Sequence, residues 1–99
     1  MTDEEIVDFM VNKNQEQFNY LKFCEEATEL QELLLKKVNK VDKKDIPSNL
    51  GIIDEIGDVK VRLLVLEKMF GEDNINERVK YKMEKWKGYI EKGKYQGKL

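Results

Sequence analysis

The chain has 99 residues, of which 40% are hydrophobic and 38% charged, and its formal net charge is −2. A chain of this length holds one small core, and this charged fraction favours long helices with solvated faces over disorder. One Pro and six Gly provide too few turns for a many-stranded β fold. We therefore predict an all-α fold in a single domain, residues 1–99.

The sequence also indicates the compartment and excludes two classes of partner. The lone Cys24 has no internal disulfide partner, which suits a reducing compartment. No apolar run approaches the roughly 20 residues of a membrane span, and the acidic start does not resemble a signal peptide. A sequence pI of about 5.3 argues against a nucleic-acid-binding domain. We expect a cytoplasmic protein with neither a membrane nor a nucleic acid as partner.

The first two predicted helices lie in the acidic half of the chain. The first covers residues 3–12, with Thr2 and Glu5 forming a capping box. The second runs from about 15 to 39, before a polar loop at 39–48. We expect Cys24 to be a small buried side chain of the second helix. Its predicted apolar stripe is Phe18, Leu21, Cys24, Ala27 or Thr28, Leu30 or Leu34, Leu35 and Val38.

The third and fourth helices complete the predicted bundle. The third begins at 48 or 49 and ends near 70, where Gly71 provides the stop. It is apolar on nearly every face, so it must be covered all round, and we predict a homo-oligomer. The fourth begins after Asn74, which pairs with Glu77, and ends near 91. A flexible basic tail is expected at 92–99.

Two acidic stretches stand out in the second and third helices. Glu26 and Glu29 are three residues apart, as are Glu55 and Asp58. Residues three apart share a helix face, so packing of the two helices would bring four carboxylates together. The line 52, 55, 59, 62, 66 of the third helix reads Ile, Glu, Val, Arg, Leu, so Glu55 interrupts an apolar stripe, where an unpaired charge is costly. Gly57 lies between the acids of the third helix and predicts a close approach by a neighbouring helix.

Gathered carboxylates indicate a cation that offsets their repulsion. Oxygen ligands without His favour Mg²⁺, with Mn²⁺ as a substitute. The alternative is plain surface charge, because acid pairs at this spacing are common on exposed helix faces. Residues 1–59 carry 7 Lys/Arg against 14 Asp/Glu, and residues 60–99 carry 11 against 6. This asymmetry fits a metal bound to a polyanion, and it equally fits two helical halves that attract each other.

The pattern Glu25-Glu26-x-x-Glu29, followed after 25 residues by Glu55-x-x-Asp58, resembles the signature of MazG-like all-α nucleoside triphosphate pyrophosphohydrolases. The resemblance spans residues from about 15 to 90. It implies a homodimer or a dimer of dimers, and cleavage of a (deoxy)nucleoside triphosphate into monophosphate and pyrophosphate, which cleans the nucleotide pool. It also implies Glu26, Glu29, Glu55 and Asp58 as Mg²⁺ ligands. Glu25 and Glu26 are then the catalytic residues, and Glu25 either activates the water or supports the ligands from behind.

The resemblance further implies that basic residues of the last helix contact substrate phosphates. Lys82 and Lys85 match best, and the alternative is a plain solvated face. The family often has an Asn and then an Arg in this stretch, where the chain has Trp86 and Tyr89. Trp86 either stacks on the nucleobase or packs in a core or interface. The rival to the enzyme is a non-enzymatic helical oligomeric interaction or regulatory protein.

Overall fold

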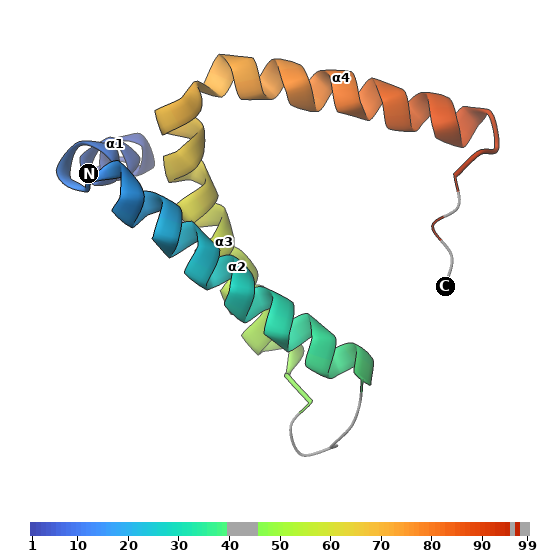
Figure 1. The fold of residues 1–99 in the computed structure, drawn as a ribbon, viewed down its shortest axis with the longest axis horizontal. Coiled ribbons are helices and arrows are strands. Elements are labelled where there is room, and N and C mark those ends of the chain that lie inside the picture. Colours follow the sequence, from blue (N-terminus) through green and yellow to red (C-terminus); the bar gives the residue numbers. More distant parts are fainter. Residues whose placement is uncertain (40–45, 96, 98–99) are drawn as a thin grey trace. The chain divides into compact units, whose positions relative to one another are not determined.

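The structure is a computed structural model that describes residues 1–39, 46–95 and 97. Within these residues it consists of four helices and no strand, which confirms the all-α prediction (Figure 1). The helices are α1 (Asp3–Lys13), α2 (Glu16–Asn39), α3 (Asn49–Phe70) and α4 (Glu72–Glu91). The predicted loop lies largely outside the described residues, with 46–48 non-helical. None of the helices in these ranges is both long and apolar enough to cross a membrane.

The chain divides into two compact units. The first, Met1–Met69, holds α1, α2 and almost all of α3, and the second, Phe70–Leu99, holds α4 and the residues that follow it. The fully buried side chains belong to the first unit, and none of the residues of α4 is buried. The single domain expected from the chain length stays a prediction.

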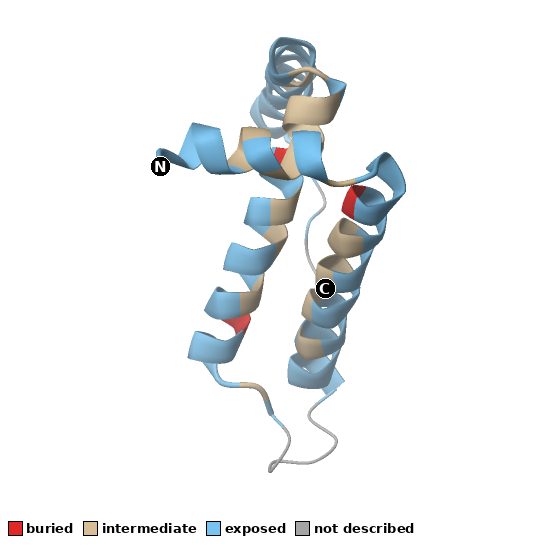
Figure 2. Cartoon of the chain, turned by 90° about the vertical axis from the view of Figure 1, so that its left-hand side faces the viewer, coloured by how far each residue is buried: buried red, intermediate tan, exposed pale blue. Residues whose placement is uncertain are grey.

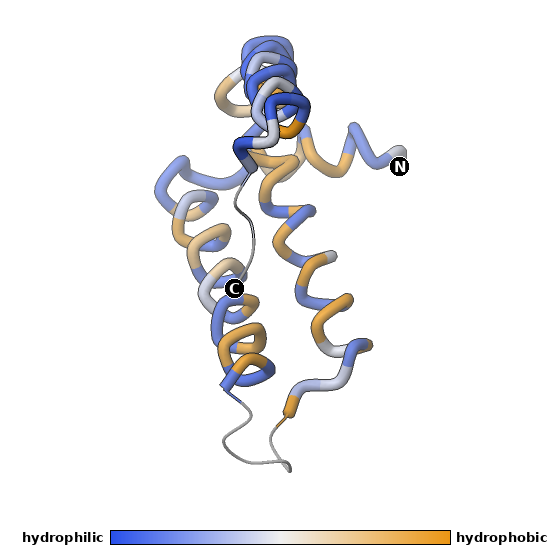
Figure 3. The backbone as a smooth tube through the Cα atoms, turned by 90° about the vertical axis from the view of Figure 1, so that its right-hand side faces the viewer, coloured by the Kyte–Doolittle hydropathy of each residue, from blue (hydrophilic) through white to orange (hydrophobic). Residues whose placement is uncertain are grey.

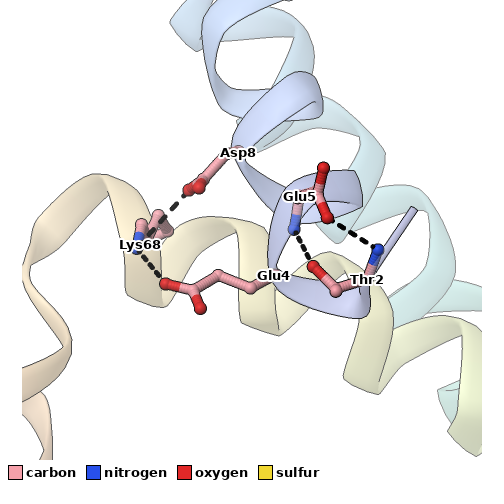
Figure 4. Close-up of polar contacts among 5 residues, drawn as sticks. All are labelled: Thr2, Glu4, Glu5, Asp8 and Lys68. Atoms are coloured by element: carbon pink, nitrogen blue, oxygen red, sulfur yellow. Dashed lines mark hydrogen bonds and ion pairs between the residues drawn. The ribbon is translucent and has the colours of Figure 1, made fainter.

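Helix α1 begins with the predicted capping box. The Glu5 backbone N–H donates to Thr2 Oγ1 at 3.1 Å, and the Thr2 backbone N–H donates to Glu5 Oε1 at 3.1 Å (Figure 4). These hydrogen bonds satisfy two donors that a helix start leaves unpaired, and they lower the pKa of the Glu5 carboxyl. The helix ends at Lys13, where the Asn14 N–H bonds to Met10 O.

Helices α2 and α3 lie side by side and antiparallel (Figures 1 and 2). Near one end, Asn19 Nδ2 lies 3.5 Å from Met69 Sδ. Near the other end, Lys37 Nζ donates to Asn49 Oδ1 at 2.7 Å. These two contacts bracket the helix pair, so residues near the middle of α2 face residues in the first half of α3.

The face that α2 turns toward its neighbours differs from the predicted stripe. Phe18, Leu21 and Cys24 are exposed, so the expectation that Cys24 is buried was wrong. Of the predicted stripe, Ala27 and Leu30 are partly covered and the other members are exposed. The covered stripe consists of Asn19, Phe23, Glu26, Leu30 and Leu33. Two of its members, Asn19 and Glu26, are polar. A search for apolar residues at helical spacing therefore does not select this stripe.

Helix α3 has apolar residues on nearly every face, as predicted, and they alternate with polar ones along the tube in Figure 3. Ile52 and Val65 are buried, and they lie on or beside the line 52, 55, 59, 62, 66 identified from the sequence. The other faces remain open, and Leu50 and Ile53 are 79% and 61% exposed. The tan stripes on α2 and α3 in Figure 2 mark where the two helices cover each other.

Helix α1 packs at the end of the pair where Asn19 lies. Lys68 Nζ of α3 lies 3.5 Å from Glu4 Oε1 and 3.4 Å from Asp8 Oδ1 of α1 (Figure 4). Asn19 is 1% exposed, and its side chain accepts from Asn14 Nδ2 at 3.0 Å and donates to Met10 O at 3.4 Å. The three helices of the first unit therefore meet around one buried amide.

Helix α4 begins earlier than predicted. Its N-cap is Gly71 with φ +102°, rather than Asn74, and the Ile75 N–H bonds to Gly71 O at 3.1 Å. Glu72 and Asp73 occupy the first turn, where negative charge is favoured by the helix dipole. The predicted stop of α3 at Gly71 and the end of α4 near 91 are confirmed. The predicted flexible tail falls partly outside the described residues, which here include 92–95 and 97.

Candidate metal centre

Three of the four predicted carboxylate ligands lie together between α2 and α3. Glu26, Glu29 and Glu55 each offer one carboxylate oxygen, and these oxygens lie within 4.8 Å of one another. Glu26 and Glu29 come from one turn of α2, and Glu55 comes from the first half of α3. The antiparallel alignment of the two helices therefore brings together the two acidic stretches that the sequence singled out.

The local sequence explains why Glu26 and Glu55 are partly buried in the contact between the helices, whereas Glu29 is exposed beside them. Glu26 lies on the covered stripe of α2, four residues before Leu30. Glu55 lies three residues after the buried Ile52 on the covered stripe of α3. Residues three or four apart share a helix face, so the apolar packing that joins the helices also carries the carboxylates into the contact.

Two oxygens of this cluster are buried without a hydrogen-bond donor. They are Glu26 Oε2 and Glu55 Oε1, and each is almost inaccessible to solvent. An ionised carboxylate can only accept, so two facing carboxylates cannot satisfy each other. Buried acceptors almost always have a hydrogen-bond donor. Two buried carboxylate oxygens without a donor therefore require a proton or a cation beside them.

The electrostatics of the cluster agree with this need. A hydrogen bond from the protonated Glu55 carboxyl to Glu26, together with desolvation and the charges of Glu26, Glu29 and Asp58, raises the pKa of Glu55 to about 7. The charge of Glu26 is the largest cause that raises the pKa of Glu29. In the absence of a cation, the cluster therefore retains a proton up to near-neutral pH.

Asp58 and Glu25 lie outside the group of three. Asp58 is exposed, and its charge contributes to the raised pKa of Glu55. Glu25 Oε2 accepts a hydrogen bond from Lys22 Nζ at 3.1 Å, and both side chains remain partly exposed. Sequence reasoning did not identify Lys22 as a partner of Glu25, although their spacing of three residues was a signal for it.

The donor set fits a hard divalent cation. All three groups are carboxylates, and Mg²⁺ prefers oxygen ligands. The oxygens lie within 4.8 Å of one another, a limit wider than the about 4.2 Å that spans one Mg²⁺ ion, so the carboxylates would have to close in to share it. Exposed acidic groups often hold no ion, so the two buried oxygens without a donor are the stronger indication.

Gly57 does not have the role that the sequence suggested. A Cβ built on Gly57 meets no atom of the described residues within 4 Å, apart from its own helix backbone. The expected close approach by another helix of the same chain is therefore wrong. Gly57 is exposed, on a different face of α3 from Ile52 and Glu55.

The predicted substrate contacts belong to the second unit of the chain. Lys82, Lys85 and Trp86 all lie on α4 and are exposed. Lys85 Nζ lies 5.8 Å from the centre of the Tyr89 ring, and the Trp86 and Tyr89 rings meet edge to face with centres 5.9 Å apart. The cations and aromatic rings that could bind a nucleotide are thus adjacent on one helix.

Comparisons with models of protein families, with curated proteins and with solved structures found no match to this chain. The interpretation of the site therefore rests on its geometry and on the chemistry of its residues.

Proposed function

We propose that the protein is a Mg²⁺-dependent nucleoside triphosphate pyrophosphohydrolase that resembles the MazG-like enzymes. It would convert a (deoxy)nucleoside triphosphate into the monophosphate and pyrophosphate, and so remove unwanted nucleotides from the pool. The observation that carries the proposal is the cluster of Glu26, Glu29 and Glu55, with ligand oxygens within 4.8 Å and two buried oxygens without a donor. The rival is a helical interaction protein without enzymatic activity.

In this proposal Glu26, Glu29 and Glu55 hold the cation, and Asp58 joins them by turning its exposed side chain toward the cluster. Mn²⁺ can substitute for Mg²⁺, because both accept carboxylate oxygens. The bound cation supplies charge neutralisation and polarises the phosphate under attack. That charge would offset the repulsion among the carboxylates, which adds to the hydrogen bond with Glu26 and to desolvation in raising the pKa of Glu55.

The remaining chemistry requires a base and groups that position the substrate. The chain has no His, so a carboxylate must take the proton from the attacking water. Glu25 and Glu26 are the residues assigned to this step, and the pairing with Lys22 fixes one oxygen of Glu25. Water adds to the α-phosphorus while the bond to the oxygen bridging to the β-phosphorus breaks. Pyrophosphate then leaves with that bridging oxygen.

Lys82 and Lys85 are assigned to the substrate phosphates, and Trp86 to the base. Phosphoryl transfer depends mainly on positioning and charge neutralisation, which lysines supply without a covalent intermediate. The cation–aromatic contact of Lys85 with Tyr89 holds that lysine beside the rings.

The test is pyrophosphate release from a panel of ribo- and deoxynucleoside triphosphates, with Mg²⁺ and with EDTA. We expect release from one or a few substrates that requires the cation. No release from any substrate, while the protein remains folded by circular dichroism, would favour the rival interaction protein.

We also propose that the chain forms a homodimer or a dimer of dimers. The support is the uncovered apolar surface of the α2–α3 pair, which includes Leu34, Leu35, Leu50 and Ile53. Large apolar side chains left exposed in such number can be buried by a second copy of the chain. Sedimentation equilibrium at micromolar protein should give a dimer or tetramer mass, and a monomer mass would contradict the proposal.

A further inference from the structure

The end of α4 carries a cavity that the proposed metal centre does not use. Its volume is about 470 Å³, and it is lined by Trp86, Tyr89, Lys94, Tyr95 and Gly97, all in the second unit. Sites for small organic ligands usually measure roughly 300–1,000 Å³ and are rich in aromatic side chains. The cavity therefore has the size and the lining of a site for one small molecule.

A glycine turn builds this cavity. Gly93 has φ +67°, a conformation that favours glycine, and it follows directly on the helix C-cap at Lys92. The Gly93 N–H bonds to Ile90 O at 3.0 Å, and the Lys94 N–H bonds to Tyr89 O at 2.9 Å. The turn reverses the chain, so that Tyr95 comes back beside Trp86, one ring on the tail and one on the helix.

The three aromatic rings lie together at the end of α4. The Trp86 and Tyr95 rings meet at an interplanar angle of 80° with centres 5.9 Å apart, and the Trp86 and Tyr89 rings meet at 72°. In an edge-to-face contact the edge of one ring meets one face of the other, and the opposite face of that second ring stays open. All three side chains are exposed, with Trp86 at 52% and Tyr95 at 58%. A flat ring can therefore reach the ring faces that these contacts leave open.

The charge of the residues around the cavity distinguishes between a cationic ligand and an anionic one. Three aromatic rings can also enclose a quaternary ammonium group. Here Lys94 lines the cavity and Lys85 Nζ lies 5.8 Å from the Tyr89 ring centre, so a cation would be repelled. Residues 78–98 contain eight Lys/Arg against two acids. The site therefore favours a planar ring that carries negative charge.

We propose that Trp86, Tyr89 and Tyr95 bind the base of a nucleoside phosphate, with Lys85 and Lys94 at its phosphates. The choice of a nucleoside phosphate rests on the proposed function, whereas the preference for an anionic planar ligand rests on the cavity alone. Base recognition thereby belongs to the turn at Gly93 and the rings that it brings together. This extends the substrate site beyond Trp86 to the segment that follows α4.

Trp86 provides the measurement, because it is the only Trp in the chain. The full chain is titrated with ATP and with CTP in EDTA, so that binding is followed without hydrolysis, and fluorescence is corrected for nucleotide absorbance. Stacking on Trp86 should quench its emission in a saturable way. Tripolyphosphate has the charge without the base, and choline has a quaternary ammonium group. Neither should give the same quench.

The decisive variant is Tyr95→Ala, with Tyr81→Ala as its matched control. Tyr81 is an exposed tyrosine of α4 that stacks on Arg78 and does not line the cavity. Loss of one stacking ring should raise the Kd about fivefold or more in Tyr95→Ala, and Tyr81→Ala should stay within about twofold of the parent. Equal effects of the two substitutions, an equal quench by tripolyphosphate, or binding of choline would overturn the proposal.

This outcome is separable from that of the proposed function. Nucleotide-dependent quenching without pyrophosphate release would support the proposed base site and contradict the proposed hydrolase activity. Pyrophosphate release with no base-dependent quenching, and unchanged KM in Tyr95→Ala, would keep the hydrolase and reject the base site.

Discussion

Two groups of polar side chains lie in the contact between α2 and α3, and they differ in whether their buried atoms have hydrogen-bond partners. Around Asn19, a buried amide has partners on three sides, from Asn14, Met10 and Met69. In the carboxylate cluster, Glu26 Oε2 and Glu55 Oε1 are buried and have no donor while both groups are ionised. The first group is complete within the chain, so its role is to hold the helices. The second requires a proton or a cation, so it is the spot where a ligand would change the energy of the structure.

The largest expected effect comes from Glu55→Gln. The amide keeps the shape, removes one charge and supplies a donor to Glu26, so metal-dependent activity should fall by more than about 100-fold. In EDTA above pH 7, the same variant should unfold at a higher temperature than the parent chain, because the repulsion is relieved. A variant with reduced thermal stability in EDTA would contradict this interpretation of the cluster.

Glu32→Gln is the matched control for this experiment. Glu32 is an exposed acid of α2 outside the group of three carboxylates. The substitution changes the net charge by the same amount, one turn after Glu29 and outside the three ligand groups. Activity and EDTA stability should therefore stay close to those of the parent, and a loss equal to that of Glu55→Gln would point to net charge alone.

At Asn19, whose buried amide has all its partners within the chain, we expect a substitution to change stability and not metal binding. Asn19→Ala should lower the free energy of unfolding by about 1–3 kcal/mol, because Asn14 and the Met10 carbonyl lose a buried partner. Mg²⁺ affinity measured by calorimetry on the folded variant should be unchanged. Asn12→Ala, at an exposed position of α1, serves as the control and should stay within about 0.5 kcal/mol of the parent in denaturant titrations.

The smallest effect is the pH dependence of stability without metal. The pKa of Glu55 is raised from 4.5 to about 7 in the folded chain, so between these values the folded state holds a proton that the unfolded state has lost. Stability in EDTA should therefore fall as pH rises through this window and change little through this group above it. Mg²⁺ should remove most of the decrease, and Glu55→Gln should flatten it. Thermal midpoints across the window, with and without Mg²⁺, provide the check.

The sequence identified the acids of this site better than it identified the helix face that presents them. The line 52, 55, 59, 62, 66 of α3 was predicted, and Glu55 and Arg62 are its charged members. On α2, the Phe18 stripe and the Phe23 stripe both carry apolar residues, the second with Asn19 and Glu26 among them, and only packing against α3 chooses between them. Spacing therefore located Glu26 and Glu29, whereas periodicity assigned most of the buried stripe of α2 to another side.

Other features depended on backbone geometry that residue types do not determine. Asn74 has the chemistry of an N-cap, yet Gly71 begins α4 directly after α3 ends. The return of Tyr95 toward Trp86 depends on the left-handed conformation of Gly93. A Gly after a helix signals a turn, and the rings that the turn brings together follow only from the structure.

The contacts at the two ends of the α2–α3 pair have a consequence for how the helices could slide. A helix that is apolar all round can shift along its neighbour by one turn, about 5.4 Å, and still bury comparable side chains. Such a shift would separate Asn19 from Met69 and Lys37 from Asn49. A polar residue at a helix interface is known to select one register at some cost in stability. These end contacts therefore set the register of the pair, and with it the separation at which Glu55 meets the acids of α2.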